Sequence, residues 1–249
     1  MGKKIIAFDV DGTLSPSRSK IDAEMADLLK KLLEKMKVAI ITGGAFADIK
    51  KQVLDEIGEN EKRNKNLTLL PTNGSSLWIY NSAWKEIFNY KLTNEEKEKI
   101  IKTIKEVVGC DNCQNKNDGL GEKIQDRGSE ITYSALGEHA KIADKQSWDP
   151  DFKKRVSLQA ELMKRLPEFE VKIGGTTSID ITAKGMDKAF AIKKLMEYFN
   201  YKKEDILFFG DAVYENGNDY PVFKMGIETI KVGNADETKV RLIEILNLK

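Results

Sequence analysis

Apolar residues along the chain follow two patterns, short continuous runs and stripes with helical spacing. Short apolar runs at residues 3–7, 38–41 and 206–209 predict buried β-strands. Between the first two runs, apolar residues recur at the spacing of one helix face: Ile21, Met25, Leu28, Leu29, Leu32 and Met36. A second stripe runs from Phe46 to Ile57 and stops at Gly58. This alternation of strands and helices predicts a parallel sheet with helices on its faces.

The pattern changes after about residue 81. Thr93 and Glu96 form a capping box before a helical stripe that ends at Gly109. Further on, residues 130–136, 169–173 and 178–182 read as strands, and Asp149-Pro150 reads as a helix start. Strands and helices no longer alternate strictly here, which indicates a separate α+β unit. The alternating pattern returns at about residue 184.

The simplest organisation is therefore a discontinuous α/β core with an inserted domain. We expect the core to comprise residues 1–81 and 185–249, and the α+β insertion to comprise residues 82–184. The chain has 249 residues, which is long enough for two such units.

Polar side chains follow the predicted core strands at the point where each strand ends. Asp9 and Asp11 follow the first strand, Thr42 the second, and Asp211 a late strand, while Lys188 lies at the start of the helix before that late strand. Ligands of open α/β sheets bind beyond the carboxyl ends of the strands, so these side chains are expected to converge. Asp9 and Asp11 also suit an ordinary turn, and Thr42 also suits a helix cap.

This set of side chains is what phosphoryl transfer requires. Asp9 and Asp211 can offer carboxylates to Mg²⁺, which prefers oxygen ligands. An aspartate can act as a nucleophile that forms an aspartyl-phosphate, and Asp9 has this role in our interpretation. Asp11 would act as general acid and base and offer the metal only its backbone carbonyl, while Thr42 and Lys188 would contact the phosphoryl oxygens.

Composition and charge exclude several other classes of function. The formal net charge of +1 argues against nucleic acid or a membrane surface as the main partner. The sequence has no apolar run long enough to span a bilayer, and its start lacks the apolar segment of a signal peptide, so we expect a soluble cytoplasmic protein. The pair Cys110 and Cys113 lacks enough neighbouring ligands for a zinc site, so we interpret both as surface thiols.

The motifs together resemble the haloacid dehalogenase superfamily. The resemblance rests on the segment 9–13, the strand end at Thr42, Lys188 and the pair Gly210-Asp211. It implies a Rossmann-like core, Mg²⁺, an aspartyl-phosphate intermediate and an inserted cap of type IIB. The segments 15–18, 174–180, 185–188 and 217–219 are similar to the eukaryotic-type phosphomannomutase branch. A phosphosugar is then the expected substrate, and a homodimer through the cap is left open.

The resemblance also assigns further residues to the site. Residues similar to those that contact the substrate are Arg18, Gly43, Arg127, Ser178 and Asp180. Residues similar to the family's metal-binding set are Asp9, Asp11, Asp211, Asn218 and Asp219.

One departure from the mutase pattern favours hydrolysis. Mutases carry a cap arginine that grips the distal phosphate, but Glu138 stands at the similar position here. An acid would repel a second phosphate, although Lys141 could compensate. We therefore expect a Mg²⁺-dependent phosphatase acting on a sugar phosphate, with a phosphomannomutase-type phosphohexomutase as the alternative. A phospho-aspartyl receiver module is a third hypothesis, but a receiver needs no inserted lid.

Overall fold

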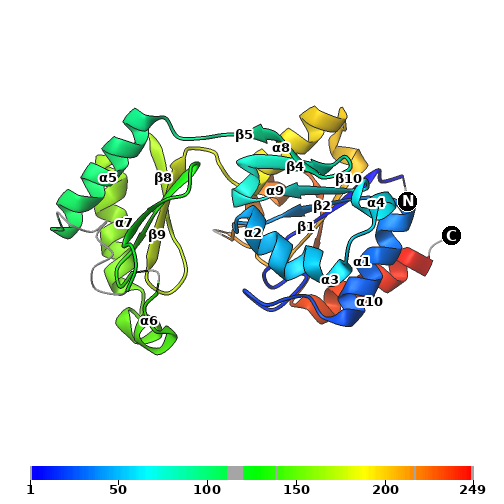
Figure 1. Ribbon diagram of the computed structural model, residues 1–249, viewed down its shortest axis with the longest axis horizontal. Helices are drawn as coiled ribbons and strands as arrows, with labels where there is room; N and C mark the ends of the chain where they lie inside the picture. Colours follow the sequence, from blue (N-terminus) through cyan, green and yellow to red (C-terminus); the bar gives the residue numbers. More distant parts are fainter. Residues whose placement is uncertain (1, 111–119, 138, 216, 248–249) are drawn as a thin grey trace. The chain divides into compact units, whose positions relative to one another are not determined.

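The computed structural model describes residues 2–110, 120–137, 139–215 and 217–247, and the chain divides into two compact units. The core unit comprises Met1–Asn89 and Met186–Lys249, and the cap comprises Tyr90–Gly185. Figure 1 shows each unit with its own sheet. The first boundary lies beyond residue 81, because β5 (Trp84–Asn89) pairs with β4 (Ser76–Tyr80) as part of the core sheet.

The core unit is an α/β unit with a mostly parallel sheet of seven strands in the order β11-β10-β1-β2-β3-β4-β5. The other strands are β1 (Ile5–Phe8), β2 (Lys37–Ile41), β3 (Leu67–Leu70), β10 (Ile206–Gly210) and β11 (Glu228–Lys231). β1 pairs in parallel with both β10 and β2, so the carboxyl ends of these strands lie at one edge of the sheet. The turn between the antiparallel strands β3 and β4 contains a short 3₁₀ helix, η2 (Thr72–Gly74).

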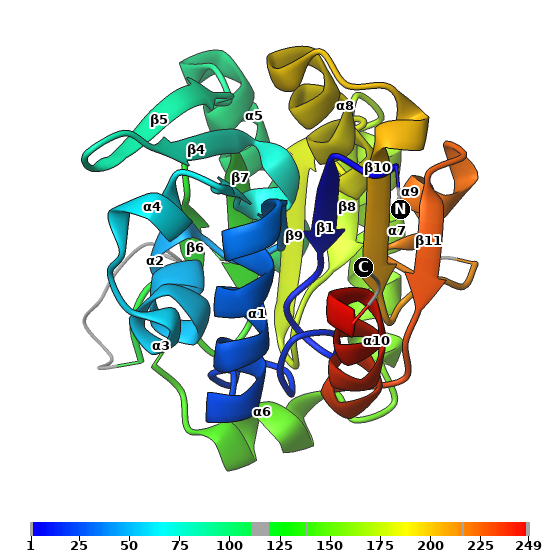
Figure 2. The same ribbon diagram turned by 90° about the vertical axis from the view of Figure 1, so that its right-hand side faces the viewer.

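Helices cover both faces of the core sheet. The helices that cover them are α1 (Ala23–Lys35), α8 (Lys188–Phe199), α9 (Tyr220–Lys224) and α10 (Ala235–Asn247). Side chains of α1 and α10 pack with one face of the sheet, and side chains of α8 and α9 pack with the other. Figure 2 shows α1 and α10 together on their face of the sheet. The α/β core with a parallel sheet, expected from the apolar runs, is confirmed.

The segment after β2 is helical but not one regular helix. It consists of α2 (Phe46–Ile49), a π-helical turn η1 (Lys50–Leu54) and α3 (Asp55–Ile57), and it ends at Gly58 with φ +68°. Single π-helical turns rotate the side chains that follow them and often occur at functional sites. After Gly58 the chain forms a further short helix, α4 (Glu61–Asn64), whose first turn is capped by Asn60.

The cap has an antiparallel sheet of four strands in the order β6-β7-β9-β8. Its strands are β6 (Ile124–Asp126), β7 (Glu130–Ser134), β8 (Phe169–Ile173) and β9 (Ser178–Ala183). Its helices are α5 (Asn94–Val108), α6 (Ile142–Trp148) and α7 (Lys153–Arg165). Helices α5 and α7 pack on one face of the sheet and bury its apolar side chains (Figure 1). The inserted α+β fold of the cap is confirmed.

Two local predictions for the cap have different outcomes. The capping box is confirmed, because Thr93 Oγ1 accepts from Glu96 N and Glu96 Oε2 accepts from Thr93 N. The helix start at Asp149-Pro150 is wrong, because α7 begins at Lys153. The Asp149 carboxylate instead accepts hydrogen bonds from the backbone N–H groups of Lys154 and Arg155 from outside the helix.

The expected surface thiol at Cys110 is also wrong, since Cys110 is disulfide-bonded and no free cysteine is found among the described residues. Cys113 lies outside the described residues. In the described part of the chain, no helix is both long enough and apolar enough to cross a membrane.

Candidate active site

The core unit brings four charged side chains together at one edge of its sheet. Asp9 follows β1, Asp211 follows the neighbouring strand β10, and Asp219 precedes α9 in the loop after β10. Lys188 is the first residue of α8, a helix whose N-terminus is capped by the Asp187 carboxylate. The cap residue thus fixes the point where α8 begins and with it the position of Lys188.

Lys188 joins two of the carboxylates inside the protein. Its Nζ lies 2.7 Å from Asp9 Oδ1 and 2.6 Å from Asp219 Oδ1. Lys188 and Asp219 are fully buried, and Asp9 is 2% exposed. Burial acts to lower the pKa of Lys188, but the attraction of Asp9 and Asp219 outweighs it and raises the pKa, so the ammonium stays charged.

The two carboxylate oxygens of Asp9 differ in their hydrogen bonds. Oδ1 accepts from Lys188, whereas Oδ2 is buried and has no hydrogen-bond partner in the described part of the chain. Burial raises the pKa of Asp9 to about 7, with Lys188 acting against this shift and Asp219 adding to it. A buried carboxylate oxygen without a partner is costly, and a bound group would remove this cost.

Three carboxylates are close enough to share one cation. Ligand atoms of Asp9, Asp211 and Asp219 lie within 4.8 Å of one another. Gly12, at φ +87°, lies against Asp211, and a Cβ there would lie 2.5 Å from Asp211 Oδ2. The three converging carboxylates, two of them on buried residues, are hard oxygen ligands of the kind that Mg²⁺ prefers, so the residues present suit this ion.

Asp11 is not part of the carboxylate cluster that the structure defines. Its Oδ1 accepts from the backbone N–H of Arg18 and, at 3.3 Å, from Gln52 Nε2. Gln52 lies on the π-helical turn η1 and is 7% exposed. No signal in the sequence points to Gln52, because its neighbours follow a helical apolar stripe and the π-turn is not visible in that stripe.

Thr42 is not the N-cap of the helix that follows, a role the sequence left open, because Ala45 is the residue immediately before α2. Its Oγ1 accepts from Gly44 N at 3.1 Å, and its side chain is 1% exposed. Gly43 is exposed and lies near the side chain of Asn73, a residue at φ +53° whose N–H donates to Thr42 O. Phosphate contact by Thr42 and Gly43 stays a prediction, and Asn73 was not identified from the sequence.

The side chains of two other predicted site residues, Arg18 and Asn218, are exposed. The side chain of Arg18 is exposed, and only its backbone N–H contacts a site residue, Asp11. Asn218 is exposed next to the buried Asp219. Their roles in substrate and metal binding stay predictions.

The remaining predicted residues lie in the cap. Arg127 follows β6, and its Nη1 lies 3.3 Å from Glu130 Oε1. Ser178 and Asp180 alternate along β9, and Asp180 Oδ1 accepts from Thr132 Oγ1 at 2.9 Å. Glu138 lies outside the described residues, so the structure does not bear on the departure from the mutase pattern noted there.

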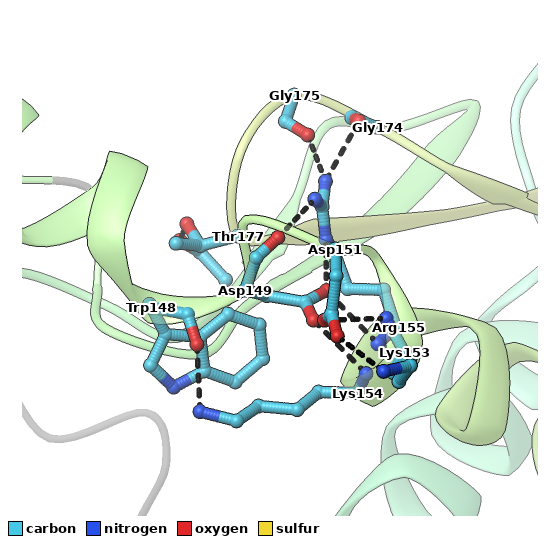
Figure 3. Close-up of polar contacts among 10 residues, drawn as sticks. Trp148, Asp149, Asp151, Lys153, Lys154, Arg155, Gly174, Gly175 and Thr177 are labelled. Carbon is cyan, nitrogen blue, oxygen red and sulfur yellow. Dashed lines mark hydrogen bonds and ion pairs between the residues drawn. The ribbon is translucent and has the colours of Figure 1, made fainter.

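A buried ion pair holds the turn that leads into β9. Arg155 is 2% exposed and Asp149 is 3% exposed, and Arg155 Nε donates to Asp149 Oδ2 at 2.8 Å. Figure 3 shows the Arg155 guanidinium also donating to the carbonyl oxygens of Gly174 and Gly175. Arg155 therefore fixes the backbone immediately before Ser178, and sequence reasoning, which treated this stretch as a helix start, did not identify it.

The fold and the carboxylate site define the class of protein. A family model described as haloacid dehalogenase-like hydrolase matches residues 6–242, and the chain belongs to this family. Enzymes of this family typically use Mg²⁺.

Relatives with sequence similarity over nearly the whole chain are phosphomannomutases. A phosphomannomutase of Encephalitozoon cuniculi is 30% identical, and the match covers 95% of this chain and 91% of the relative. A phosphomannomutase of Schizosaccharomyces pombe is 27% identical over 99% of this chain and 95% of the relative.

Two solved structures share the fold. An IMP-bound IMP-nucleotidase of Plasmodium falciparum, truncated at its N-terminus, aligns at a TM-score of 0.67 and 19% identity, over 99% of this chain and 69% of that chain. A haloacid dehalogenase-like hydrolase of Bacteroides thetaiotaomicron aligns at a TM-score of 0.68 and 17% identity, over 98% of this chain and 99% of that chain.

Proposed function

We propose that this enzyme transfers the phosphoryl group of a sugar phosphate to Asp9 in a Mg²⁺-dependent reaction. The observation that carries the proposal is the state of Asp9: Lys188 fixes one carboxylate oxygen, and the other is buried without a partner. A nucleophile needs this combination of restraint and a free lone pair. The family assignment supports an enzyme rather than a receiver module.

The reaction has two steps in this proposal. Asp9 Oδ2 attacks phosphorus, the bond from phosphorus to the sugar oxygen breaks, and Asp11 gives its proton to that oxygen. In the second step Asp11 removes a proton from the acceptor, whose oxygen attacks phosphorus and releases Asp9. The contacts of Asp11 with Arg18 N and Gln52 support this role, because they hold its carboxyl away from the acidic cluster. Lys188 keeps Asp9 oriented throughout.

Asp9, Asp211 and Asp219 would hold the cation, with Asn218 and the backbone carbonyl of Asp11 as further candidates from the sequence. Mg²⁺ would neutralise charge on the phosphoryl oxygens and reduce the repulsion between a carboxylate nucleophile and an anionic substrate. Thr42 and Gly43 would donate hydrogen bonds to the same oxygens.

The acceptor in the second step is either a sugar hydroxyl or water. The relatives named phosphomannomutase favour the sugar hydroxyl, which makes the mutase better supported by the comparisons than the phosphatase expected from Glu138. One observation on this chain favours water: the cap guanidinium of Arg127 is already paired with Glu130.

To test the proposal, the wild-type enzyme is incubated with mannose 1-phosphate, Mg²⁺ and a hexose bisphosphate as activator. We would follow isomers by nuclear magnetic resonance and inorganic phosphate by a colorimetric assay. Interconversion without phosphate release identifies a mutase, and steady phosphate release identifies a phosphatase. Asp9→Asn should abolish both while its circular dichroism spectrum stays that of the wild type. Substantial turnover by Asp9→Asn, or no turnover by the wild type across a panel of phosphosugars, would refute the proposal.

A further inference from the structure

The face of the cap sheet opposite α5 and α7 carries polar side chains. In the β7–β9 pair, Glu130 lies opposite Thr182, Thr132 opposite Asp180, and Ser134 opposite Ser178. Directly opposite residues of antiparallel strands project to the same side of the sheet, and their neighbours Ile131, Tyr133, Ile179 and Ile181 pack in the cap core. We call the six residues the polar cap face: Glu130, Thr132, Ser134, Ser178, Asp180 and Thr182.

Glu130 is the buried acid of the polar cap face. It is 5% exposed, and its Oε1 accepts from Thr132 Oγ1 at 3.1 Å. Thr132 Oγ1 also lies 2.9 Å from Asp180 Oδ1. A hydroxyl has one proton, so it cannot serve two ionised carboxylates fully. Burial, together with Asp180, raises the pKa of Glu130 to about 7 against the effect of Arg127, which agrees with this shortage.

Thr182, opposite Glu130, has an unsatisfied hydroxyl. Its Oγ1 is buried and has no hydrogen-bond partner among the described residues. The residue is 7% exposed, so bulk water does not account for this group. The fold therefore leaves a polar group beside Glu130 without a hydrogen bond, which adds to the polar character of this face.

Arg127 is the cation at the edge of this face. Half of its side chain is exposed, and its guanidinium contacts Glu130 and, at 2.9 Å, Gln125 Oε1. Arginine is the side chain best suited to bind a phosphate, but here its charge is compensated by Glu130. Strand β8 adds one acid and one base to this face, because Glu170 lies opposite Thr182 and the exposed Lys172 lies opposite Asp180. Acidic side chains therefore still outnumber basic ones on this side of the cap sheet.

We propose that Glu130 is a specificity-determining residue: its carboxylate holds Arg127, so that the cap favours the hydroxyl-bearing part of a sugar monophosphate over a second phosphate. The inference rests on the proposed phosphoryl transfer and deepens it. An anionic group that reaches Arg127 must displace Glu130 or bind beside it, and both are unfavourable next to Asp180.

The test compares the wild type and Glu130→Gln at about pH 8, above the pKa of Glu130, where the substitution keeps the shape and removes the charge. Substrates are glucose 6-phosphate and glucose 1,6-bisphosphate with Mg²⁺. We expect the preference for the bisphosphate, as the ratio of kcat/KM values, to rise roughly five- to tenfold through KM, the change expected for one partly exposed charge contact. Glu168→Gln, which removes an exposed cap carboxylate paired with Lys99, should leave the ratio unchanged.

A second variant shows whether Glu130 acts through Arg127. In an Arg127→Gln background the effect of Glu130→Gln should disappear, since the cation that both groups compete for is gone. An unchanged ratio in a Glu130→Gln protein that melts like the wild type would overturn the inference, and so would an undiminished effect without Arg127.

Failure of the proposed function gives a different result. In that case the wild type turns over neither substrate, and calorimetric binding of the bisphosphate to wild type and Glu130→Gln tests the inference by itself. Tighter binding to the variant supports it, and equal binding contradicts it.

Discussion

The core unit and the cap each contain a group of acids that a base contacts, but the two groups are built differently. In the core, Lys188 is fully buried and bridges Asp9 and Asp219 directly. In the cap, Arg127 is half exposed, and the acids Glu130 and Asp180 are joined through the Thr132 hydroxyl. Among the residues that the structure describes, Asp9 Oδ2 in the core and Thr182 Oγ1 in the cap are buried without a hydrogen-bond partner.

This difference indicates which group can vary and which cannot. Each charge of the core group depends on the others, because removing one leaves another buried without compensation. The cap group contacts solvent through Arg127, so a change there alters affinity with little cost to the fold. Burial alone therefore makes substitutions in the core group costly and substitutions at Arg127 in the cap group cheap.

After Asp9→Asn, the largest effect on activity in the core unit should come from Asp11→Asn, beside the core group. The variant keeps an acceptor for Arg18 N but cannot carry a proton, so we expect kcat to fall about 10²- to 10⁴-fold. Steady-state kinetics with the best phosphosugar checks this. Asp27→Asn, a matched change on the surface of α1, serves as control. A loss below about tenfold would remove Asp11 as the general acid and base.

The two bases should differ in their effect on stability. Lys188→Met leaves Asp9 and Asp219 buried without their cation, and we expect a loss of about 3–5 kcal/mol in the free energy of unfolding. Arg127→Met removes a half-exposed partner and should cost about 1 kcal/mol or less. Urea denaturation in the presence of a chelator measures both. Similar losses for the two variants would contradict the comparison.

The sequence predicts the core group better than the cap group. Strand ends in a parallel sheet converge, so Asp9, Thr42 and Asp211 could be placed at one edge from the apolar runs alone. Alternation along residues 130–134 shows which side chains share a face, but not that Glu130 is buried against Arg127. Such a contact depends on strand register, which the pattern of one strand does not contain.

Backbone irregularities explain why the sequence pattern did not identify some residues near the site. Gln52 contacts Asp11 only because η1 is a π-helical turn, and Asn73 lies beside Gly43 in a left-handed conformation. Neither feature changes the apolar spacing that was used to find helices and strands. Strand β5 was assigned to the cap because its exposed residues lack the apolar run of a buried strand, although it pairs at the edge of the core sheet.

The dependence of the free energy of unfolding on pH should reveal the titration of Glu130 in the cap group. The pKa of Glu130 rises from 4.5 to about 7 on folding, so between these pH values the folded state binds more protons than the unfolded state. The stabilisation that Glu130 contributes is therefore present at low pH, decreases as the pH rises towards 7, and does not change further above that pH. The raised pKa of Asp9 causes a fall in stability of the same sign, and this fall is equal in the wild type and in Glu130→Gln.

The measurement is the free energy of unfolding of wild type and Glu130→Gln between about pH 5 and pH 8, with chelator present. The difference between the two proteins should change by up to about 3 kcal/mol across the window where Glu130 titrates. Parallel curves would mean that Glu130 is ionised in the folded protein.

Mg²⁺ should stabilise the protein through the core group and not through the cap group. A cation present at about 100 times its Kd adds about 2.7 kcal/mol to the free energy of unfolding, because it binds only the folded cluster. Asp211→Asn replaces a ligand oxygen by an amide and should remove most of this gain, whereas Glu130→Gln should keep it. Asp236→Asn, on the surface of α10, is the matched control for the aspartate change. If Mg²⁺ stabilised Asp211→Asn as much as the wild type, the cation would bind elsewhere, and the unpartnered oxygen of Asp9 would need another explanation.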